Sequence, residues 1–302
     1  MIDYPRNIME FEREFSTEKQ CRDYILKLKY GDGIYTCSQC GSKKSWPVRE
    51  TVYECAKCHH QESILSGTIF QDTHKPLLLW FHAIWYITSQ KNGTSALGLQ
   101  RVLGIGSYKT AWTWLHKLRR AMVRPGRDKL KGRVEVDETF FGAPEMGGKR
   151  GRGAENKVQA AIAVEIDEKT IGRIRIGIID DASQISLHNF VKEVVEPGST
   201  VITDGWRGYN GLEGIGYQHE RIEHDDNEIL LPHVHTVISL IKRWILGTLQ
   251  GSCSQEHLSY YFDEYTFRFN RRTSKSRGML FYRLLQNAVI LEPTTYEDII
   301  AK

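Results

Sequence analysis

Four cysteines near the start of the chain constrain its fold more than any other feature. They form two Cys-x-x-Cys pairs, Cys37-Ser-Gln-Cys40 and Cys55-Ala-Lys-Cys58, with 14 residues between the pairs. Two pairs at this spacing are typical of a tetrahedral Zn²⁺ site with four thiolate ligands. A redox dithiol is the alternative, but it requires only one pair. Because a four-thiolate site has no open position for a substrate, we expect one structural zinc ion per chain.

The composition is that of an ordinary globular protein with two or three domains. The chain has 302 residues, of which 40% are hydrophobic and 26% are charged. Cys21 and Cys253 match no disulfide framework, which favours a reducing cytosol. The N-terminus lacks the pattern of a signal peptide, and no apolar run approaches the roughly 18 residues of a membrane span. We therefore expect a cytoplasmic protein with no membrane partner.

Basic residues gather in three stretches of the chain. Ten Lys or Arg residues stand against one acid between residues 101 and 133, and further clusters lie at 149–152 and 268–277. Aromatic residues lie between the charges of the last cluster. A single basic run is usually a solvated face, but three such runs beside a zinc module favour a nucleic-acid partner.

The first half of the chain reads as a zinc ribbon followed by helices. Residues 16–29 predict a helix, with Thr17 and Gln20 as a capping box and Gly31 just past its end. Short β-type runs at 45–48 and 51–54 lie between the cysteine pairs. Helices are then expected at 76–88, 95–104 and 107–122, with a glycine turn between the last two. This is a helix-turn-helix arrangement, although a small helical bundle has similar turns.

The second half has the element order of a ribonuclease-H-like α/β domain. Alternating apolar residues predict strands at 133–141, 158–166, 173–179, 199–203 and, weakly, 217–222. Helices are expected at 183–195, 233–249 and 257–269. The apolar face of the helix at 183–195 is expected to consist of Ile185, Phe190, Val191 and Val194.

Two aspartates lie where this layout brings strands together. Asp137 is within the first strand and Asp204 ends the fourth, which is the neighbour of the first in this fold. Two adjacent carboxylates repel each other unless a divalent cation lies between them, so the pair predicts a Mg²⁺ or Mn²⁺ site. Such sites catalyse phosphodiester cleavage and transfer. The alternative is that each aspartate merely ends a strand or begins a turn.

A third ligand is expected from the long helix at 233–249. His235 and Lys242 are seven residues apart, which places them on one helical face. Imidazole suits Mn²⁺ better than Mg²⁺. A solvated histidine is the alternative for His235, and Asp226 and Glu228 are rival ligands just upstream.

Taken together, these motifs resemble the ISXO-like insertion-sequence transposases, which are DDE-type recombinases with an N-terminal zinc ribbon. The resemblance covers roughly residues 15–275. It is carried by the two cysteine pairs, Gly67-Thr-Ile-Phe70, Val136-Asp-Glu-Thr-Phe-Phe-Gly142, Ile202-Thr-Asp-Gly-Trp-Arg-Gly-Tyr209, His235 to Lys242 with Gly247-Thr248, and Tyr260 to Arg272.

The resemblance implies a multidomain protein. We expect an N-terminal helix and zinc ribbon at 1–72, a helix-turn-helix-like DNA-binding segment with a basic linker at 73–131, a ribonuclease-H-like catalytic domain at 132–292 and a tail at 293–302. The implied catalytic set is Asp137, Asp204, a third residue that in the family is Glu, Asn or His (here His235), and Lys242. The first three would hold two Mg²⁺ or Mn²⁺ ions, and Lys242 would contact a phosphate.

The implied activity is DNA transposition in a bacterial, nucleoid-associated protein. The enzyme would cleave one strand at each terminal inverted repeat and join the freed 3′-OH to target DNA, as a homodimer or higher homo-oligomer on double-stranded DNA. A non-catalytic DNA-binding regulator and a structure-specific nuclease are the alternatives. The residues expected to contact DNA are Lys109, Lys117, Arg119, Arg120, Lys149, Arg150, Arg243, Arg268, Arg271 and Arg272.

Overall fold

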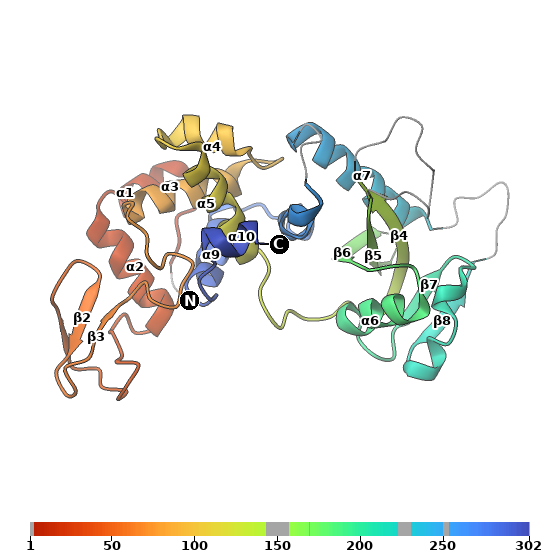
Figure 1. Cartoon of the computed structure of the whole chain (residues 1–302), viewed down its shortest axis with the longest axis horizontal. Helices are drawn as coiled ribbons and strands as arrows, with labels where there is room; N and C mark the ends of the chain where they lie inside the picture. Colours follow the sequence, from red (N-terminus) through yellow and green to blue (C-terminus); the bar gives the residue numbers. More distant parts are fainter. Residues whose placement is uncertain (1–2, 143–156, 169, 223–230, 250–253, 302) are drawn as a thin grey trace. The chain divides into compact units, whose positions relative to one another are not determined.

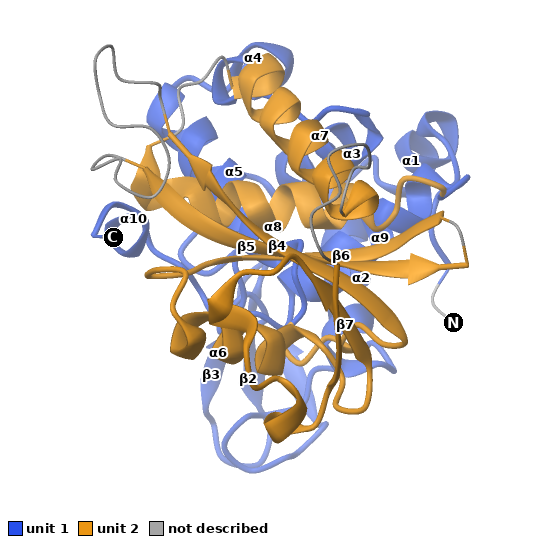
Figure 2. Ribbon diagram, turned by 90° about the vertical axis from the view of Figure 1, so that its right-hand side faces the viewer, with its two compact units in different colours: residues 1–124, 274–302 blue, residues 125–273 orange. Residues whose placement is uncertain are grey.

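The computed structural model describes residues 3–142, 157–168, 170–222, 231–249 and 254–301. The chain divides into two compact units, which have different colours in Figure 2. Unit 1 comprises residues 1–124 and 274–302, and unit 2 comprises residues 125–273.

Unit 1 begins with two helices and a small sheet. Helix α2 (Glu18–Tyr30) has the expected capping box between Thr17 and Gln20 and ends at Gly31, whose φ is +75°. Helix α1 (Ile8–Glu14) was not predicted; its cap is Asn7, whose side chain accepts from the backbone of Glu10. Three antiparallel strands follow in the order β1 (Ser45–Pro47), β2 (Val52–Cys55) and β3 (Gln61–Ser63). The third was also not predicted.

The three helices expected after the ribbon are confirmed. They are α3 (Leu77–Ser89), α4 (Ala96–Leu103) and α5 (Tyr108–Ala121). Gly104 ends α4 in the left-handed conformation, with φ at +63°, as a turn between two helices requires. Trp80 of α3 stacks on Trp114 of α5, with 3.7 Å between the ring centroids. The helix-turn-helix arrangement is therefore part of a packed helical unit.

The C-terminal helices α9 (Arg277–Ala288) and α10 (Tyr296–Ile300) belong to unit 1. Phe281 of α9 packs against an aromatic cluster that includes Phe11, Phe15 and Phe81. The side chain of Asn287 donates to the carbonyl of Ala121 at 2.8 Å. Residues 274–292, which the sequence analysis assigned to the catalytic domain, therefore complete the core of the N-terminal helices instead.

Unit 2 contains a five-stranded mixed sheet with the strand order β6-β5-β4-β7-β8. The first three strands in the chain, β4 (Arg133–Phe141), β5 (Val158–Asp167) and β6 (Thr170–Ile178), pair antiparallel. Strand β7 (Thr200–Thr203) then pairs parallel to β4, and β8 (Gln218–Arg221) pairs parallel to β7. The expectation that the first and fourth strands are neighbours is confirmed.

Helices cover both faces of this sheet (Figure 1). Helix α6 (Gln184–Val194) packs on Val134, Val136 and Val201. Helices α7 (Pro232–Leu249) and α8 (Leu258–Phe269) pack on the other face, against residues that include Phe141 and Ile202. Three short 3₁₀ segments complete the unit: η2 (Arg207–Tyr209), η3 (Glu213–Ile215) and η4 (Gln255–His257). Side chains alternate between the two faces along a strand. Since Val134 and Val136 face α6, the odd-numbered residues of β4 face α7.

One apolar position was assigned to the wrong face. Ile185 was expected in the core face of α6, but it is 75% exposed. The buried apolar residues of α6 are Leu187, Phe190, Val191 and Val194, which follow the i, i+3, i+4, i+7 spacing of one helical face. Ile185 lies two positions before Leu187, and a step of two residues carries a side chain round the helix to another face.

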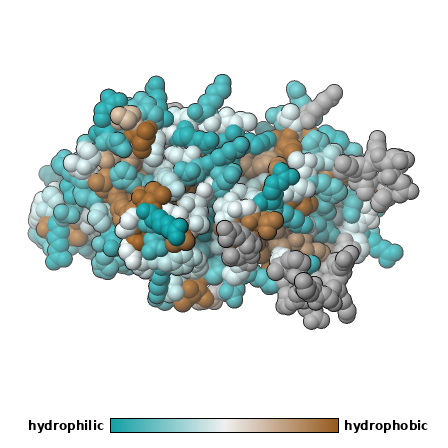
Figure 3. Space-filling view, turned by 90° about the horizontal axis from the view of Figure 1, so that it is seen from above, coloured by the Kyte–Doolittle hydropathy of each residue, from teal (hydrophilic) through white to brown (hydrophobic). Residues whose placement is uncertain are grey.

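The surface combines polar and apolar residues. In the view of Figure 3, hydrophobic residues form separate patches among hydrophilic ones. Among the residues that the structure describes, none of the helices has both the length and the apolar character that crossing a bilayer would require.

Candidate functional site

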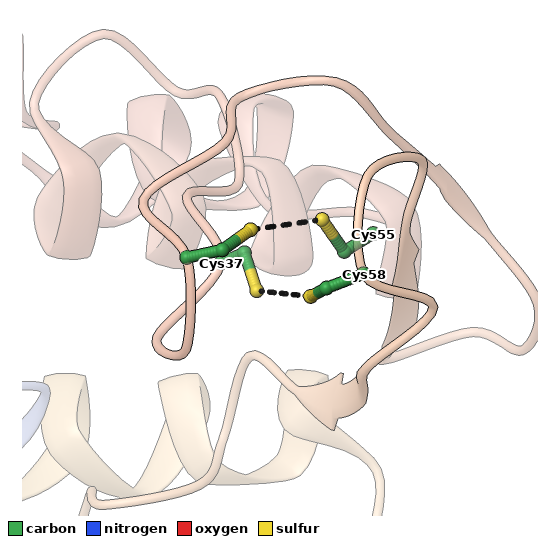
Figure 4. Close-up of side chains that lie close together, drawn as sticks. Cys37, Cys55 and Cys58 are labelled. Carbon is green, nitrogen blue, oxygen red and sulfur yellow. Dashed lines mark hydrogen bonds between the residues drawn. The ribbon is translucent and has the colours of Figure 1, made fainter.

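The four cysteines of the ribbon converge on one point. Their sulfur atoms all lie within 4.8 Å of one another, and Figure 4 shows the labelled side chains of Cys37, Cys55 and Cys58 directed toward a common centre. The Cys37–Cys58 and Cys40–Cys55 sulfur distances are 3.6 and 3.5 Å. A tetrahedral zinc ion with Zn–S bonds of about 2.3 Å separates its sulfur ligands by about 3.8 Å. The donor set and its spacing therefore fit Zn²⁺.

Local backbone geometry builds each half of this site. The residue after each pair, Gly41 or His59, has a positive φ, at +69° and +58°. Each of these residues donates its N–H to the carbonyl of the first cysteine of its pair, at 2.9 Å from Gly41 to Cys37 and 3.0 Å from His59 to Cys55. The backbone N–H groups of Cys58 and, at 3.4 Å from the sulfur, of Lys57 lower the pKa of Cys55 to about 6. A thiol that ionises readily is suited to metal binding.

The neighbouring histidines are engaged elsewhere. His59 Nδ1 lies 3.2 Å from Glu54 Oε1, and His60 Nε2 lies 4.0 Å from Glu62 Oε2. The metal-ligating cluster found in the described part of the ribbon consists of the four cysteines alone.

A second group of polar side chains lies on the α7 face of β4. Glu135, Asp137 and Thr139 alternate along the strand, and each of them contacts α7. His235 Nε2 lies 3.2 Å from Asp137 Oδ2, and Lys242 Nζ donates to Thr139 Oγ1 at 2.7 Å. The predicted pairing of His235 and Lys242 on one face of the helix is therefore observed, with that face toward the strand that carries Asp137.

Asp204 approaches the same place from β7. The parallel pairing of the two strands ends with Glu135 opposite Ile202, and Asp137 and Asp204 each lie two residues further along. The carboxylate of Asp204 accepts from the backbone N–H of Trp206 at 3.0 Å. Its charge is also one of the influences that raise the pKa of Asp137. The charges of the two aspartates therefore influence each other, Asp137 from within β4 and Asp204 from just past the end of β7.

Burial dominates the electrostatics of Asp137. The side chain is only 17% exposed. Desolvation, with the charge of Glu138 second, raises the pKa of Asp137 to about 6, while the neighbouring His235 opposes the shift. Desolvation also lowers the pKa of Lys242. A largely buried carboxylate beside other acids is stabilised by a nearby cation, so this environment favours binding of a metal ion at Asp137.

Glu138 and Tyr209, which adjoin this site from the α6 face of β4, were missed by the sequence analysis. Tyr209 is fully buried and its hydroxyl donates to Glu138 Oε2 at 2.8 Å. Burial raises the pKa of Tyr209 well above its usual value, with the charges of Glu138, Asp137 and Asp204 as further causes. Tyr209 belongs to the segment Ile202 to Tyr209 that carried the family resemblance, and this was the available signal.

The structure assembles the predicted metal ligands in part. Asp137 and His235 are in contact, but Asp137, Asp204 and His235 do not form a compact three-ligand cluster of the kind that the cysteines form among the described residues. The rival ligands Asp226 and Glu228 lie outside the described residues.

Several arginines expected to bind DNA are buried or contact other residues of their own unit instead. Arg119 is only 2% exposed. Arg268 is paired with Glu264 at 2.7 Å, and both side chains are nearly buried. Neither guanidinium is exposed enough in its unit to reach a phosphate, so both expectations need correction. Arg271 and Arg272 stack on aromatic rings at 4.2 and 4.3 Å and donate to backbone carbonyls.

The remaining basic candidates are more accessible. Lys109 is exposed and lies over the ring of Tyr296 at 3.6 Å, while Arg243 on α7 is exposed next to Lys242. Lys117 and Arg120 are half-buried, and desolvation lowers the pKa of Lys117. Lys149 and Arg150 lie outside the described residues.

Comparison with known proteins joins the two sites in one family. Residues 16–61 match the transposase zinc-ribbon domain, and residues 129–270 match the ISXO2-like transposase domain. The chain therefore contains an ISXO2-like transposase domain preceded by a transposase zinc-ribbon domain. The second match spans all five strands of the unit 2 sheet together with α6, α7 and α8, and the first contains all four cysteines.

The chain is also similar to proteins of Halobacterium salinarum and Haemophilus influenzae. An uncharacterized protein in transposable element ISH50 of Halobacterium salinarum is 25% identical over 279 residues, which cover 85% of this chain and 92% of the relative. An uncharacterized transposase-like protein of Haemophilus influenzae is 26% identical over 117 residues, or 37% of this chain and 94% of the relative. The transposase family and the zinc ribbon imply that DNA is the partner.

Proposed function

We propose that this transposase cleaves DNA at the terminal inverted repeats of its element and joins the freed ends to target DNA. Unit 2 would be the ribonuclease-H-like catalytic domain. The observation that carries the proposal is the contact of His235 with Asp137, which lies within β4 beside the end of β7, where Asp204 follows. The strand order of the sheet and the helices on both its faces support the same assignment.

Asp137, Asp204 and His235 would hold two Mg²⁺ or Mn²⁺ ions. Such ions, when bound, activate the attacking oxygen and stabilise the leaving oxygen of a phosphodiester. The carboxylates would position the reacting phosphate through these ions. His235, as a nitrogen donor, would favour Mn²⁺ over Mg²⁺.

Lys242 would bind a non-bridging phosphate oxygen as a point charge. Its ammonium group is already held at the site by Thr139 at 2.7 Å. In the first step water attacks phosphorus and the P–O3′ bond breaks, which leaves a 3′-OH. In the second step that 3′-OH attacks a target phosphodiester and displaces a target 3′ oxygen. One P–O bond forms and one breaks in each step, so the reaction needs no ATP.

DNA would be held by basic groups outside this centre. The exposed candidates are Lys109 on α5 and Arg243 on α7, the half-buried Lys117 and Arg120 of α5 would assist them, and Lys149 and Arg150 join them from the sequence. Phosphate contacts of this kind position DNA without reading its sequence. The zinc ribbon and the helix-turn-helix segment would recognise the repeats, with the protein acting as a homodimer or higher oligomer.

The test is a strand-transfer assay with Mn²⁺. The substrate is duplex DNA from the inverted repeats that flank the gene, with a supercoiled plasmid as target. We expect a nick that leaves a 3′-OH, followed by a joined product, and neither product from Asp137→Asn. Nicking without joining would instead indicate a structure-specific nuclease. Binding of the repeats with neither product would indicate a non-catalytic regulator.

A further inference from the structure

A buried carboxylate on β4 has no part in the proposed chemistry. Glu135 is only 3% exposed and lies on the same strand face as Asp137, toward α7. Its neighbours Val134 and Val136 are apolar core residues on the opposite face. Burying a carboxylate is unfavourable unless hydrogen bonds compensate for the lost water, so the partners of Glu135 show what it does.

Those partners are all in the first turn of α7. Glu135 Oε2 accepts from the backbone N–H of His233 at 2.9 Å and of Val234 at 2.8 Å, and Glu135 Oε1 lies 2.6 Å from His233 Nδ1. The first turn of α7 contains no acidic residue of its own. Glu135 therefore satisfies the free N–H groups at the start of this helix and complements its positive end from a neighbouring strand.

This cap fixes the helix beside the proposed catalytic residues. Glu135 holds the backbone of residues 233 and 234, one residue before His235, which contacts Asp137. Two residues further along the strand, Thr139 accepts from Lys242. The strand thus contacts the helix through three alternate residues, Glu135, Asp137 and Thr139. Of these three contacts, that of Glu135 is the one made to the helix backbone. A backbone contact fixes the position of the helix itself, whereas side-chain contacts adjust to it.

We propose that Glu135 is a positioning residue, which docks the first turn of α7 on β4 and so keeps His235 against Asp137. This inference rests on the proposed function, because it assigns Glu135 a role through His235. Residues that orient metal ligands typically change metal affinity by about 10- to 100-fold when they are replaced.

Unit 1 contains a matched control. Glu18 of α2 caps α3 in the same way, by accepting from the backbone N–H of Leu77 at 2.9 Å and of Leu78 at 2.8 Å. Glu18→Gln removes the charge from a comparable cap that carries none of the proposed catalytic ligands. Comparing Glu18→Gln with Glu135→Gln separates the general effect of losing a helix cap from the effect of losing the cap that positions His235.

The experiment measures Mn²⁺ binding by electron paramagnetic resonance on the zinc-loaded full chain. The binding that disappears in Asp137→Asn defines the site. We expect Glu135→Gln to weaken this binding about 10-fold or more, and Glu18→Gln to leave it within about twofold of the unchanged protein. Binding in Glu135→Gln equal to that of the unchanged protein, whatever its Tm, would overturn the inference.

Two further outcomes keep the inference separate from the proposed function. If Asp137→Asn binds Mn²⁺ as the unchanged protein does, the proposed metal site itself is wrong. If Glu135→Gln does not fold, His233→Ala decides, because it removes the 2.6 Å side-chain contact and retains the carboxylate on the backbone. Weaker binding in that variant supports the inference, with an effect smaller than the roughly 10-fold expected of Glu135→Gln because the backbone contacts remain, and unchanged binding contradicts it.

Discussion

The two candidate metal sites of this transposase are built in opposite ways. The ribbon site takes four ligands of one kind from residues 37–58, and their sulfur atoms already lie at zinc-binding distances. The site on β4 takes its proposed ligands from residues 137–235, from β4, the end of β7 and α7, and among the described residues the direct contact between them is that of Asp137 with His235. A local site is complete once its own short segment folds. A non-local site depends on the whole domain and is adjusted by residues such as Glu135.

The largest effect is expected at the ribbon. Cys55→Ser should abolish binding of the single zinc ion and unfold the ribbon, because structural zinc contributes about 10–16 kcal/mol that is also folding free energy. Metal analysis and hydrogen exchange measure the two consequences. The amides of β4 and β5 should stay protected as in the unchanged protein. Retained zinc, or loss of protection in unit 2, would contradict the contrast between a local and a non-local site.

The next largest effect concerns the carboxylates. Asp137→Asn and Asp204→Asn should each lower the rates of cleavage and joining at least about 1,000-fold, since loss of a metal ligand removes stabilisation of the transition state. DNA binding should remain. Rates are measured on terminal-repeat duplexes with Mn²⁺, and Asp180→Asn, an exposed aspartate of the same unit, is the control. Near-normal cleavage by either variant would mean that the site lies elsewhere.

His235 tests the non-local character of the second site, because it is a proposed ligand that comes from a helix rather than from the strands. His235→Ala should slow both reactions about 100-fold, and His235→Glu should recover activity, most of all with Mg²⁺, because a carboxylate is a harder ligand. The ratio of Mg²⁺- to Mn²⁺-supported rates is the measurement. A silent alanine variant, together with damage from Glu228→Ala or Asp226→Ala, would move the third ligand upstream.

The smallest effect is a pH dependence of stability without added divalent ions. Because burial and Glu138 raise the folded-state pKa of Asp137 to about 6, the folded protein binds this proton more tightly than the unfolded chain does. The free energy of unfolding therefore falls as pH rises from about 4 to 6. Asp137→Asn should be more stable than the unchanged protein by about 1–3 kcal/mol above pH 6, and equally stable near pH 4.

Thermal unfolding of the zinc-loaded protein across this pH range measures the difference. Adding Mn²⁺ at neutral pH should make the unchanged protein the more stable of the two, since only the protein that retains the Asp137 carboxylate gains stability by binding the ion. An asparagine variant that is less stable at every pH would show that the Asp137 carboxylate stabilises the fold even without a metal.

Much of the chain was predictable because its signals are local. The capping box of α2, the alternation of β4 and the spacing of the cysteine pairs each depend on residues within one short segment of the chain, and the structure has them where the sequence indicated. The face of α6 was only partly predicted. Ile185 is apolar like its neighbours, and only packing on the sheet decided that it stays exposed while Leu187 is buried.

The sequence by itself determined the four cysteines of the zinc ribbon, the order of the strands and helices between residues 133 and 269, and the candidate catalytic residues, since spacing and periodicity indicate them. Only the tertiary structure decided that α9 completes unit 1, that Tyr209 lies under Glu138, that Arg119 and Arg268 are buried, and that Glu135 caps α7. The physical reason is separation along the chain. The packing of α9 and the contacts of Tyr209 with Glu138 and of Glu135 with α7 join residues about 70 or more apart in sequence. The Arg268–Glu264 pair is local, but its burial, like that of Arg119, depends on packing from several sides. No local pattern specifies such contacts; they form when sheet pairing and helix docking bring distant segments together.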